Sequence, residues 1–170
     1  MRFSKPRRIH IAGPYGSGKS TLAKEISKIL DIPIYELDEL KYDRRNKSER
    51  TEKEMETLLK KIISKKSWIV EGAWSDRARA SFKKADLVII LNPSRKSLFY
   101  NHFKRIVTKQ KNFTLKFNLK LLKKSLAYSS MTKHPSLHSH VKEVDRTKDY
   151  LIIKNLKETN SLINKLKGQI

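Results

Sequence analysis

The sequence contains no cysteine, which excludes disulfide bonds and cysteine-based zinc sites and favours a reducing compartment. Glycine and proline are few, five of each in 170 residues, and neither a Pro/Gly/Ser-rich linker nor an internal repeat divides the chain. The longest aliphatic run, Leu87 to Leu91, is far too short to span a membrane, and residues 1–6 lack a signal-peptide apolar core. The length suits one α/β domain. We therefore expect a cytoplasmic protein with no membrane partner.

Acidic residues are missing from one long stretch of a chain whose net charge is +22. Between Leu87 and Lys142 there is no Asp or Glu, but there are twelve Lys and Arg. Such a stretch suits a polyanionic ligand such as nucleotide phosphates or nucleic acid; solvated, lysine-rich helix faces are the alternative. His134, His138 and His140 lie in or beside this stretch without acidic or cysteine neighbours, which favours loop histidines over a metal site.

One glycine-rich segment carries the strongest functional signal. Gly13 to Ser20 reads GPYGSGKS and fits the phosphate-binding pattern G-x-x-x-x-G-K-[ST]. A short apolar run, 8–12, precedes it, and residues 21–30 follow with apolar residues at helical spacing. Glycines in such a loop let several backbone N–H groups point into one concavity at the positive end of the next helix. The segment therefore predicts nucleotide binding.

The predicted nucleotide-binding residues are Gly13, Tyr15, Gly16, Ser17, Gly18, Lys19, Ser20 and Thr21. In this motif the lysine, here Lys19, can reach the β- and γ-phosphates, and the hydroxyl of Ser20 can ligate Mg²⁺. We therefore predict ATP and Mg²⁺ as the cofactors.

Predicted strands and helices alternate along the chain. We expect strands at 8–12, 32–37, 68–72, 86–91 and 150–153, and helices at 21–30, 51–63, 76–84, from 93, near 115–126 and from 155. Residues 41–50 read as a loop, and Phe99, Phe103, Ile106 and Val107 are expected to face inward. This alternation predicts a doubly wound parallel sheet whose ligand lies at the carboxyl ends of the strands. Asp38, Glu71 and Asn92 fall at those ends.

These motifs resemble the small P-loop kinases. GPYGSGKST (13–21), ELDEL (36–40), WIVEG (68–72) and ADLVI (85–89) are similar to nucleotide and shikimate kinases. They most closely resemble the adenylate-kinase-like DNA topology modulation protein family. The likeness covers residues 8 to about 107 and returns over 150–167. It implies a five-stranded sheet of order 2-3-1-4-5 in one kinase-like domain over 1–170, with a helical lid at about 108–142.

The same resemblance implies roles for individual residues. Glu36 and Asp38 lie where shikimate kinases place an acidic pair for magnesium and substrate, and Glu71 ends a Walker-B-like strand. Arg105 takes the place of a phosphate-binding arginine before the lid. The predicted metal ligands are thus Ser20, Glu71 and Glu36, and the predicted catalytic residues are Lys19, Asp38 and Arg105. The lid differs from the family because 106–142 contains lysines and no arginine, and lysine cannot grip a phosphate bidentately.

The sequence therefore predicts an ATP- and Mg²⁺-dependent phosphotransferase, a monomer or homodimer, acting on a small hydroxyl- or phosphate-bearing acceptor. Trp74, Arg77 and Arg79 follow the third strand, where they either contact substrate or serve the fold. The alternative function is a nucleic-acid-binding P-loop NTPase with nucleotide as regulator. The acid-free stretch offers it few interleaved aromatic residues beyond Phe113, Phe117 and Tyr128.

Overall fold

The computed structural model describes residues 5–43, 48–74, 76–109, 115–132, 135–144 and 150–168, with the backbone alone at 105, 107–109 and 115–117. The strands are β1 Arg8–Ala12, β2 Ile34–Glu36, β3 Tyr42–Asp43, β4 Ser48–Glu49, β5 Trp68–Gly72, β6 Leu87–Leu91 and β7 Tyr150–Ile153. The helices are α1 Lys19–Leu30, α2 Leu37–Lys41, α3 Glu52–Ile63, α4 Arg79–Lys84, α5 Arg95–Lys109, α6 Leu115–Ala127, α7 Leu137–Glu143 and α8 Leu156–Lys167.

Five parallel strands form the central sheet in the order β2-β5-β1-β6-β7. Numbered by their place in the chain, these five strands have the order 2-3-1-4-5, so the predicted fold class is confirmed. The central strand β1 pairs with β5 on one side and β6 on the other. All residues of β5 and β6 are buried, as expected where helices cover both faces of a parallel sheet.

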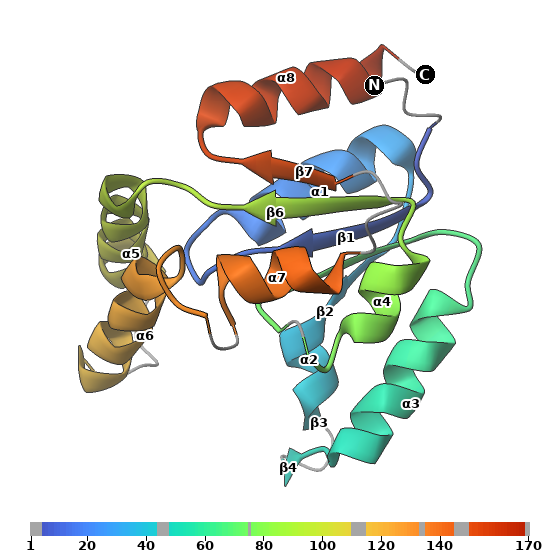
Figure 1. The fold of residues 1–170 in the computed structure, drawn as a ribbon, viewed down its shortest axis with the longest axis horizontal. Coiled ribbons are helices and arrows are strands. Elements are labelled where there is room, and N and C mark those ends of the chain that lie inside the picture. The colour runs from blue at the N-terminus through green and yellow to red at the C-terminus, as the bar shows by residue number, and fades with distance from the viewer. Residues whose placement is uncertain are drawn as a thin grey trace.

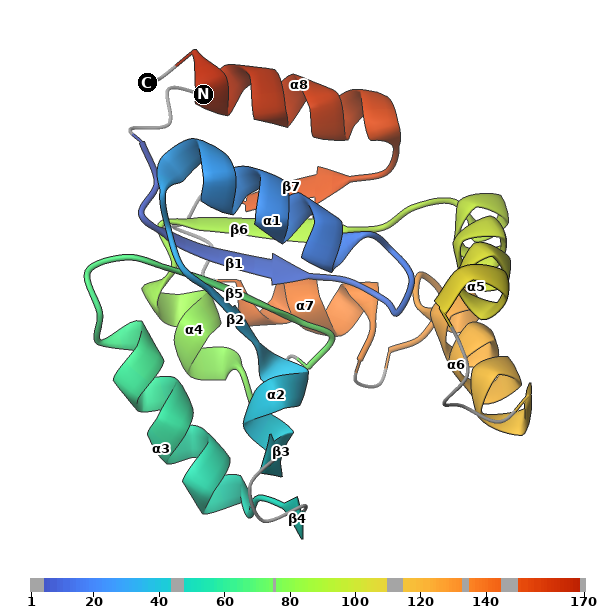
Figure 2. The same cartoon turned by 180° about the vertical axis from the view of Figure 1, so that it is seen from behind.

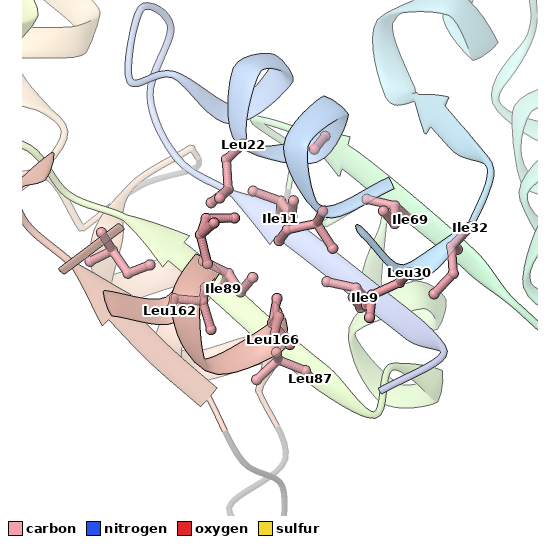
Figure 3. Close-up of a cluster of buried hydrophobic side chains, with 14 of the residues drawn as sticks. Ile9, Ile11, Leu22, Leu30, Ile32, Ile69, Leu87, Ile89, Leu162 and Leu166 are labelled. Carbon is pink, nitrogen blue, oxygen red and sulfur yellow. The ribbon is translucent and has the colours of Figure 1, made fainter. Parts of the chain in front are cut away.

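Two apolar cores lie on opposite faces of this sheet. On one face, α1 and α8 pack over the strands, as the views from both sides show (Figures 1 and 2). Figure 3 shows this cluster, in which Ile9, Ile11 and Ile89 from the strands meet Leu22 of α1 and Leu166 of α8. On the other face the strands pack against α3, α4 and α7, through Val70, Val88, Ile90, Leu59, Phe82 and Val141.

Helices α5 and α6, here called the α5–α6 arm, lie side by side beyond the carboxyl end of β6 (Figures 1 and 2). The predicted inward face of α5 is wrong for Phe99 and Phe103, whose side chains are 56% and 59% exposed. Ile106 is half-buried, and the side chain of Val107 lies outside the described part of the structure. The buried side of α5 instead carries Leu98 and His102. The arm therefore buries polar groups where the sequence pattern suggested an aromatic stripe.

Several helix ends match the sequence analysis. Thr51 and Glu54 form a capping box at the start of α3, and the Asn155 side chain accepts from the Glu158 backbone N–H at the start of α8. The 41–50 segment is not a plain loop, because β3 and β4 pair within it. Within the described ranges, no helix is long and apolar enough to cross a membrane.

Candidate functional site

The glycine-rich segment forms an open loop between β1 and α1. Gly13, Gly16 and Gly18 have φ angles of 149°, 78° and 94°, a region that favours glycine. Gly18 is the N-cap residue of α1 and has no side chain to cap the helix, and the first turn contains no acid. The first N–H groups of α1 are thus available to an anion at the positive end of the helix dipole.

Two side chains of this loop are suited to phosphate binding. Lys19 lies across the loop, and its Nζ donates to the Pro14 carbonyl at 3.0 Å. The Ser17 hydroxyl is buried without a hydrogen-bond partner among the described residues. Because a buried polar group without a partner is costly, Ser17 fits a site that a polar ligand completes.

The loop is joined to the sheet by a hydrogen bond between predicted magnesium ligands. The Ser20 hydroxyl donates to Glu71 Oε1 at 2.6 Å, and Glu71 is 4% exposed. Glu36 of β2 pairs in register with Glu71 of β5. Burial raises the pKa of Glu36 above its ordinary value, and the charge of Glu71 raises it further. Two carboxylates that repel one another beside a hydroxyl are a donor set that fits Mg²⁺, which uses one or two carboxylates plus phosphate oxygens.

The sequence analysis places Asp38 at the end of the second strand, and this placement is wrong. The strand β2 ends at Glu36, and Asp38 lies exposed in the first turn of α2. The two carboxylates therefore do not share a strand face, although the charge of Asp38 also raises the pKa of Glu36. The helix α2 approaches β5 closely because Gly72 has no side chain. A Cβ built on Gly72 would lie 2.7 Å from Leu37 Cδ1.

A pocket of about 420 Å³ opens beside the loop, between the start of α5 and the start of α8. Its lining joins Ser17 of the loop with Tyr100 and Asn101 of α5 and with Asn155 and Leu156 beyond β7. The lining also includes Lys96 and Lys154. Apolar, amide and cationic side chains next to a phosphate-binding loop suit the nucleoside half of a nucleotide.

A second pocket, of about 270 Å³, follows strand β5. Lys41, Trp74, Asp76, Arg77 and Pro135 line it. The Arg77 guanidinium lies 5.4 Å from the centre of the Trp74 ring and donates to Glu52 at 2.7 Å. Of the three predicted substrate-contact candidates, Trp74 and Arg77 therefore line this pocket.

The third candidate, Arg79, makes two hydrogen bonds to Glu143, at 2.7 Å and 2.9 Å, and so ties α4 to α7. Its guanidinium is engaged in the fold.

The fold is that of the small P-loop kinases. A shikimate kinase from Acinetobacter baumannii in complex with shikimate has a TM-score of 0.62 and 15% identity, covering 96% of this chain and 92% of the other. A shikimate kinase from Bacteroides thetaiotaomicron has a TM-score of 0.53 and 19% identity, with 96% and 97% covered. A gluconokinase from Sinorhizobium meliloti 1021 has a TM-score of 0.52 and 16% identity, with 99% and 93% covered. No protein-family description matches the sequence, and no curated protein does.

Other predicted residues fall elsewhere. Arg105 lies in α5, and its side chain is outside the described part of the structure. His134 is also outside it, and His138 is exposed. His140 is buried and contacts the Tyr128 hydroxyl and the Ala73 carbonyl. Among the described residues, no group of three or more His, Cys, Asp or Glu side chains is placed to hold a metal ion.

The sequence analysis missed three residues at the loop. Asn101, His102 and Ser125 of the α5–α6 arm contact the loop backbone. One sequence signal could have found the buried side of α5. Leu98 and His102 lie four residues apart, on one face of the helix, and both are buried.

Proposed function

We propose that this protein is an ATP- and Mg²⁺-dependent kinase of a small hydroxyl- or phosphate-bearing acceptor. The observation that carries the proposal is the 2.6 Å hydrogen bond from Ser20 to the buried Glu71. It joins the hydroxyl of a phosphate-binding loop to a carboxylate at the end of the neighbouring strand, as a shared ligand pair for magnesium requires.

When bound, MgATP supplies the phosphoryl group and neutralises part of its charge. The chain's own groups bind and orient the nucleotide, the metal and the acceptor. The amides at the start of α1 and the Lys19 ammonium hold the phosphates, while Ser20, Glu71 and Glu36 hold the metal. The 420 Å³ pocket beside Ser17 receives the nucleoside. Positioning and charge stabilisation account for most of the catalysis expected of such a site.

The acceptor binds in the pocket lined by Lys41, Trp74 and Arg77. Asp38 lies one helical turn before Lys41 on α2 and is exposed. It can therefore orient an acceptor hydroxyl or accept a proton from it. Arg105 and the arm lysines offset charge that develops on the transferred group. The printed names of the structural neighbours, shikimate kinase and gluconokinase, support an acceptor that is a small hydroxylated acid.

Two variants test this assignment. Lys19→Ala should lose binding of a non-hydrolysable ATP analogue, whereas Asp38→Asn should keep it and lose phosphoryl transfer. Calorimetry measures the first effect. A thermal-shift screen of nucleoside, nucleotide and hydroxy-acid acceptors with the analogue, followed by a transfer assay, measures the second. Unchanged nucleotide affinity and turnover in Lys19→Ala would exclude the loop as the ATP site.

Within this fold, the motif resemblance supports membership of the adenylate-kinase-like DNA topology modulation protein family. A second candidate function, nucleic-acid binding with nucleotide as regulator, is favoured by the exposed face of α5. Two adjacent stripes at four-residue spacing run along it, and all six side chains are exposed. The first stripe is Arg95, Phe99 and Phe103, and the second is Lys96, Tyr100 and Lys104. Cationic and aromatic side chains on one helix face suit the phosphates and bases of a single strand.

Hydrogen exchange and a salt series of DNA binding separate the two candidates. If residues 108–142 form a kinase lid, their amides should exchange more slowly when the ATP analogue and acceptor bind. DNA should then bind weakly and lose affinity steeply with salt. Tight DNA binding near physiological salt, without nucleotide-dependent protection of 108–142, would favour the second candidate.

A further inference from the structure

The tip of the phosphate-binding loop, Tyr15 and Gly16, is held from outside by the α5–α6 arm. Asn101 Nδ2 donates to the Gly16 carbonyl at 2.9 Å. His102 Nε2 lies 3.1 Å from the Tyr15 carbonyl, and the Ser125 hydroxyl donates to the same carbonyl at 3.0 Å. Two consecutive loop carbonyls are thus bound by side chains from two helices that lie 85 or more residues later in the chain.

The chemistry of these contacts fixes their direction. A carbonyl oxygen can only accept, so His102 donates to the Tyr15 carbonyl through a proton on Nε2. The single hydroxyl proton of Ser125 is shared between the Tyr15 carbonyl, at 3.0 Å, and the Leu121 carbonyl of its own helix, at 2.9 Å. Both side chains are buried, with exposures of 3% and 2%. Buried hydrogen bonds of this kind are shielded from water and hold their geometry firmly.

Steric fit reinforces the hydrogen bonds. A Cβ built on Gly16 would lie 2.9 Å from His102 Cδ2, and the φ of Gly16 is 78°. The rings of Tyr15 and His102 have centroids 5.1 Å apart. The histidine therefore occupies the space that any larger residue at position 16 would need.

Holding a carbonyl also orients the N–H of the same peptide. In a trans peptide the N–H points opposite to the C=O, so binding the Tyr15 carbonyl to the arm turns the Gly16 N–H away from it. The Ser17 N–H closes the turn by donating to Pro14 at 3.2 Å. A loop with three positive-φ glycines loses much conformational freedom when ordered, and the arm supplies contacts that offset this loss before a ligand binds.

We propose that Asn101, His102 and Ser125 are positioning residues that preorganise the phosphate-binding loop for a triphosphate. The inference rests on the proposed nucleotide binding at this loop. His102 and Ser125 are buried and act through the Tyr15 carbonyl. Asn101 acts through the Gly16 carbonyl and also lines the pocket assigned to the nucleoside. Preorganisation of this kind raises affinity by lowering the ordering cost on binding.

The test compares His102→Ala with His102→Gln, whose side-chain amide can again donate to Tyr15, and with the exposed control His138→Ala. Calorimetry measures the affinity of each for a non-hydrolysable ATP analogue with Mg²⁺, and for adenosine. Loss of one or two buried hydrogen bonds at the loop should weaken analogue binding about tenfold in His102→Ala. Adenosine affinity should change less than about twofold, because adenosine lacks the phosphates that the loop binds. His102→Gln should recover most of the loss.

Each other outcome has a defined meaning. Equal loss of analogue and adenosine affinity, or no loss, would overturn the positioning role while the proposed function stands. Absence of analogue binding by the unmodified protein would overturn the proposed function and the positioning role together. Ser125→Ala leaves His102 in place and carries the same measurement if His102→Ala does not fold. In either variant without nucleotide, amides 13–18 should exchange faster than in the unmodified protein, whereas those of β1 should not.

Discussion

The pair of carboxylates at the ends of β2 and β5 makes the magnesium requirement the sharpest prediction. In Glu71→Gln, the amide oxygen can still accept the hydrogen bond from Ser20, so the buried contact and the fold should persist. What disappears is the negative charge at a residue that is 4% exposed. Because the Glu71 charge helps to raise the pKa of Glu36, the variant should also lower the pKa of Glu36 toward its ordinary value.

The size of the effect follows from the charge removed. A unit charge about 4 Å from another interacts by about 4 kcal/mol at an effective dielectric constant near 20. Glu36 remains, and a water can replace the lost ligand, so part of this energy is recovered. A net loss of about 1.4 to 2.8 kcal/mol would raise the Mg²⁺ concentration for half-maximal nucleotide binding tenfold to a hundredfold.

The assay is a Mg²⁺ titration of ATP-analogue binding, followed by calorimetry or a fluorescent analogue. Glu39→Gln is the matched control, since Glu39 is exposed on α2 close to Glu36. Glu36→Gln should shift the titration in the same direction by a smaller factor. If the titration moves for neither Glu71→Gln nor Glu36→Gln, the metal is not held by these strand ends.

Three further predictions concern stability. Gly72→Ala places a Cβ 2.7 Å from Leu37 Cδ1, so overpacking should cost about 1 to 3 kcal/mol and lower the Tm by several degrees; an unchanged Tm would show that α2 moves freely. Burial, and after it the charge of His140, lowers the pKa of His10 to about 3. As the pH drops from about 6.5 to 3, the unfolded chain therefore binds a proton at His10 before the folded chain does, and the free energy of unfolding falls. His10→Leu should flatten this loss, on the order of 1 kcal/mol per pH unit, in urea unfolding at several pH values; equal pH dependence would exclude His10 as its source. Thr51→Ala removes the capping box of α3 and should cost about 1 kcal/mol by the same unfolding assay, and a value near zero would show that the cap is dispensable.

The sheet and the loop could be predicted because their signals are local. A buried strand next to a glycine-rich loop and an apolar helix leaves a clear pattern between residues 8 and 30, and each later strand repeats the apolar run. The candidate magnesium ligands Glu36 and Glu71 follow from the resemblance to the small P-loop kinases, and the register of β2 and β5 pairs them.

The arm could not be predicted in the same way. A helical pattern of aromatic residues at Phe99 and Phe103 suggests a buried face, but α5 buries His102 because the loop carbonyl of Tyr15 offers it a partner. Such pairings join residues far apart in the chain and leave no periodic signal. Asp38 was misplaced for a similar reason, since the close packing of Leu37 on Gly72 starts a helix where propensity favoured a strand.

The strand order has a consequence for how the chain folds during synthesis. The central strand β1 is made early, but its partners β5 and β6 follow only at residues 68–72 and 87–91. The apolar face of α1 is covered in part by α8, whose Leu162 and Leu166 come from the last part of the chain. Until α8 has been synthesised, Leu22 and Ile89 therefore lack part of the apolar cover that they have in the folded protein. Contacts of such long sequence separation form slowly, and apolar surface left uncovered in the meantime favours aggregation.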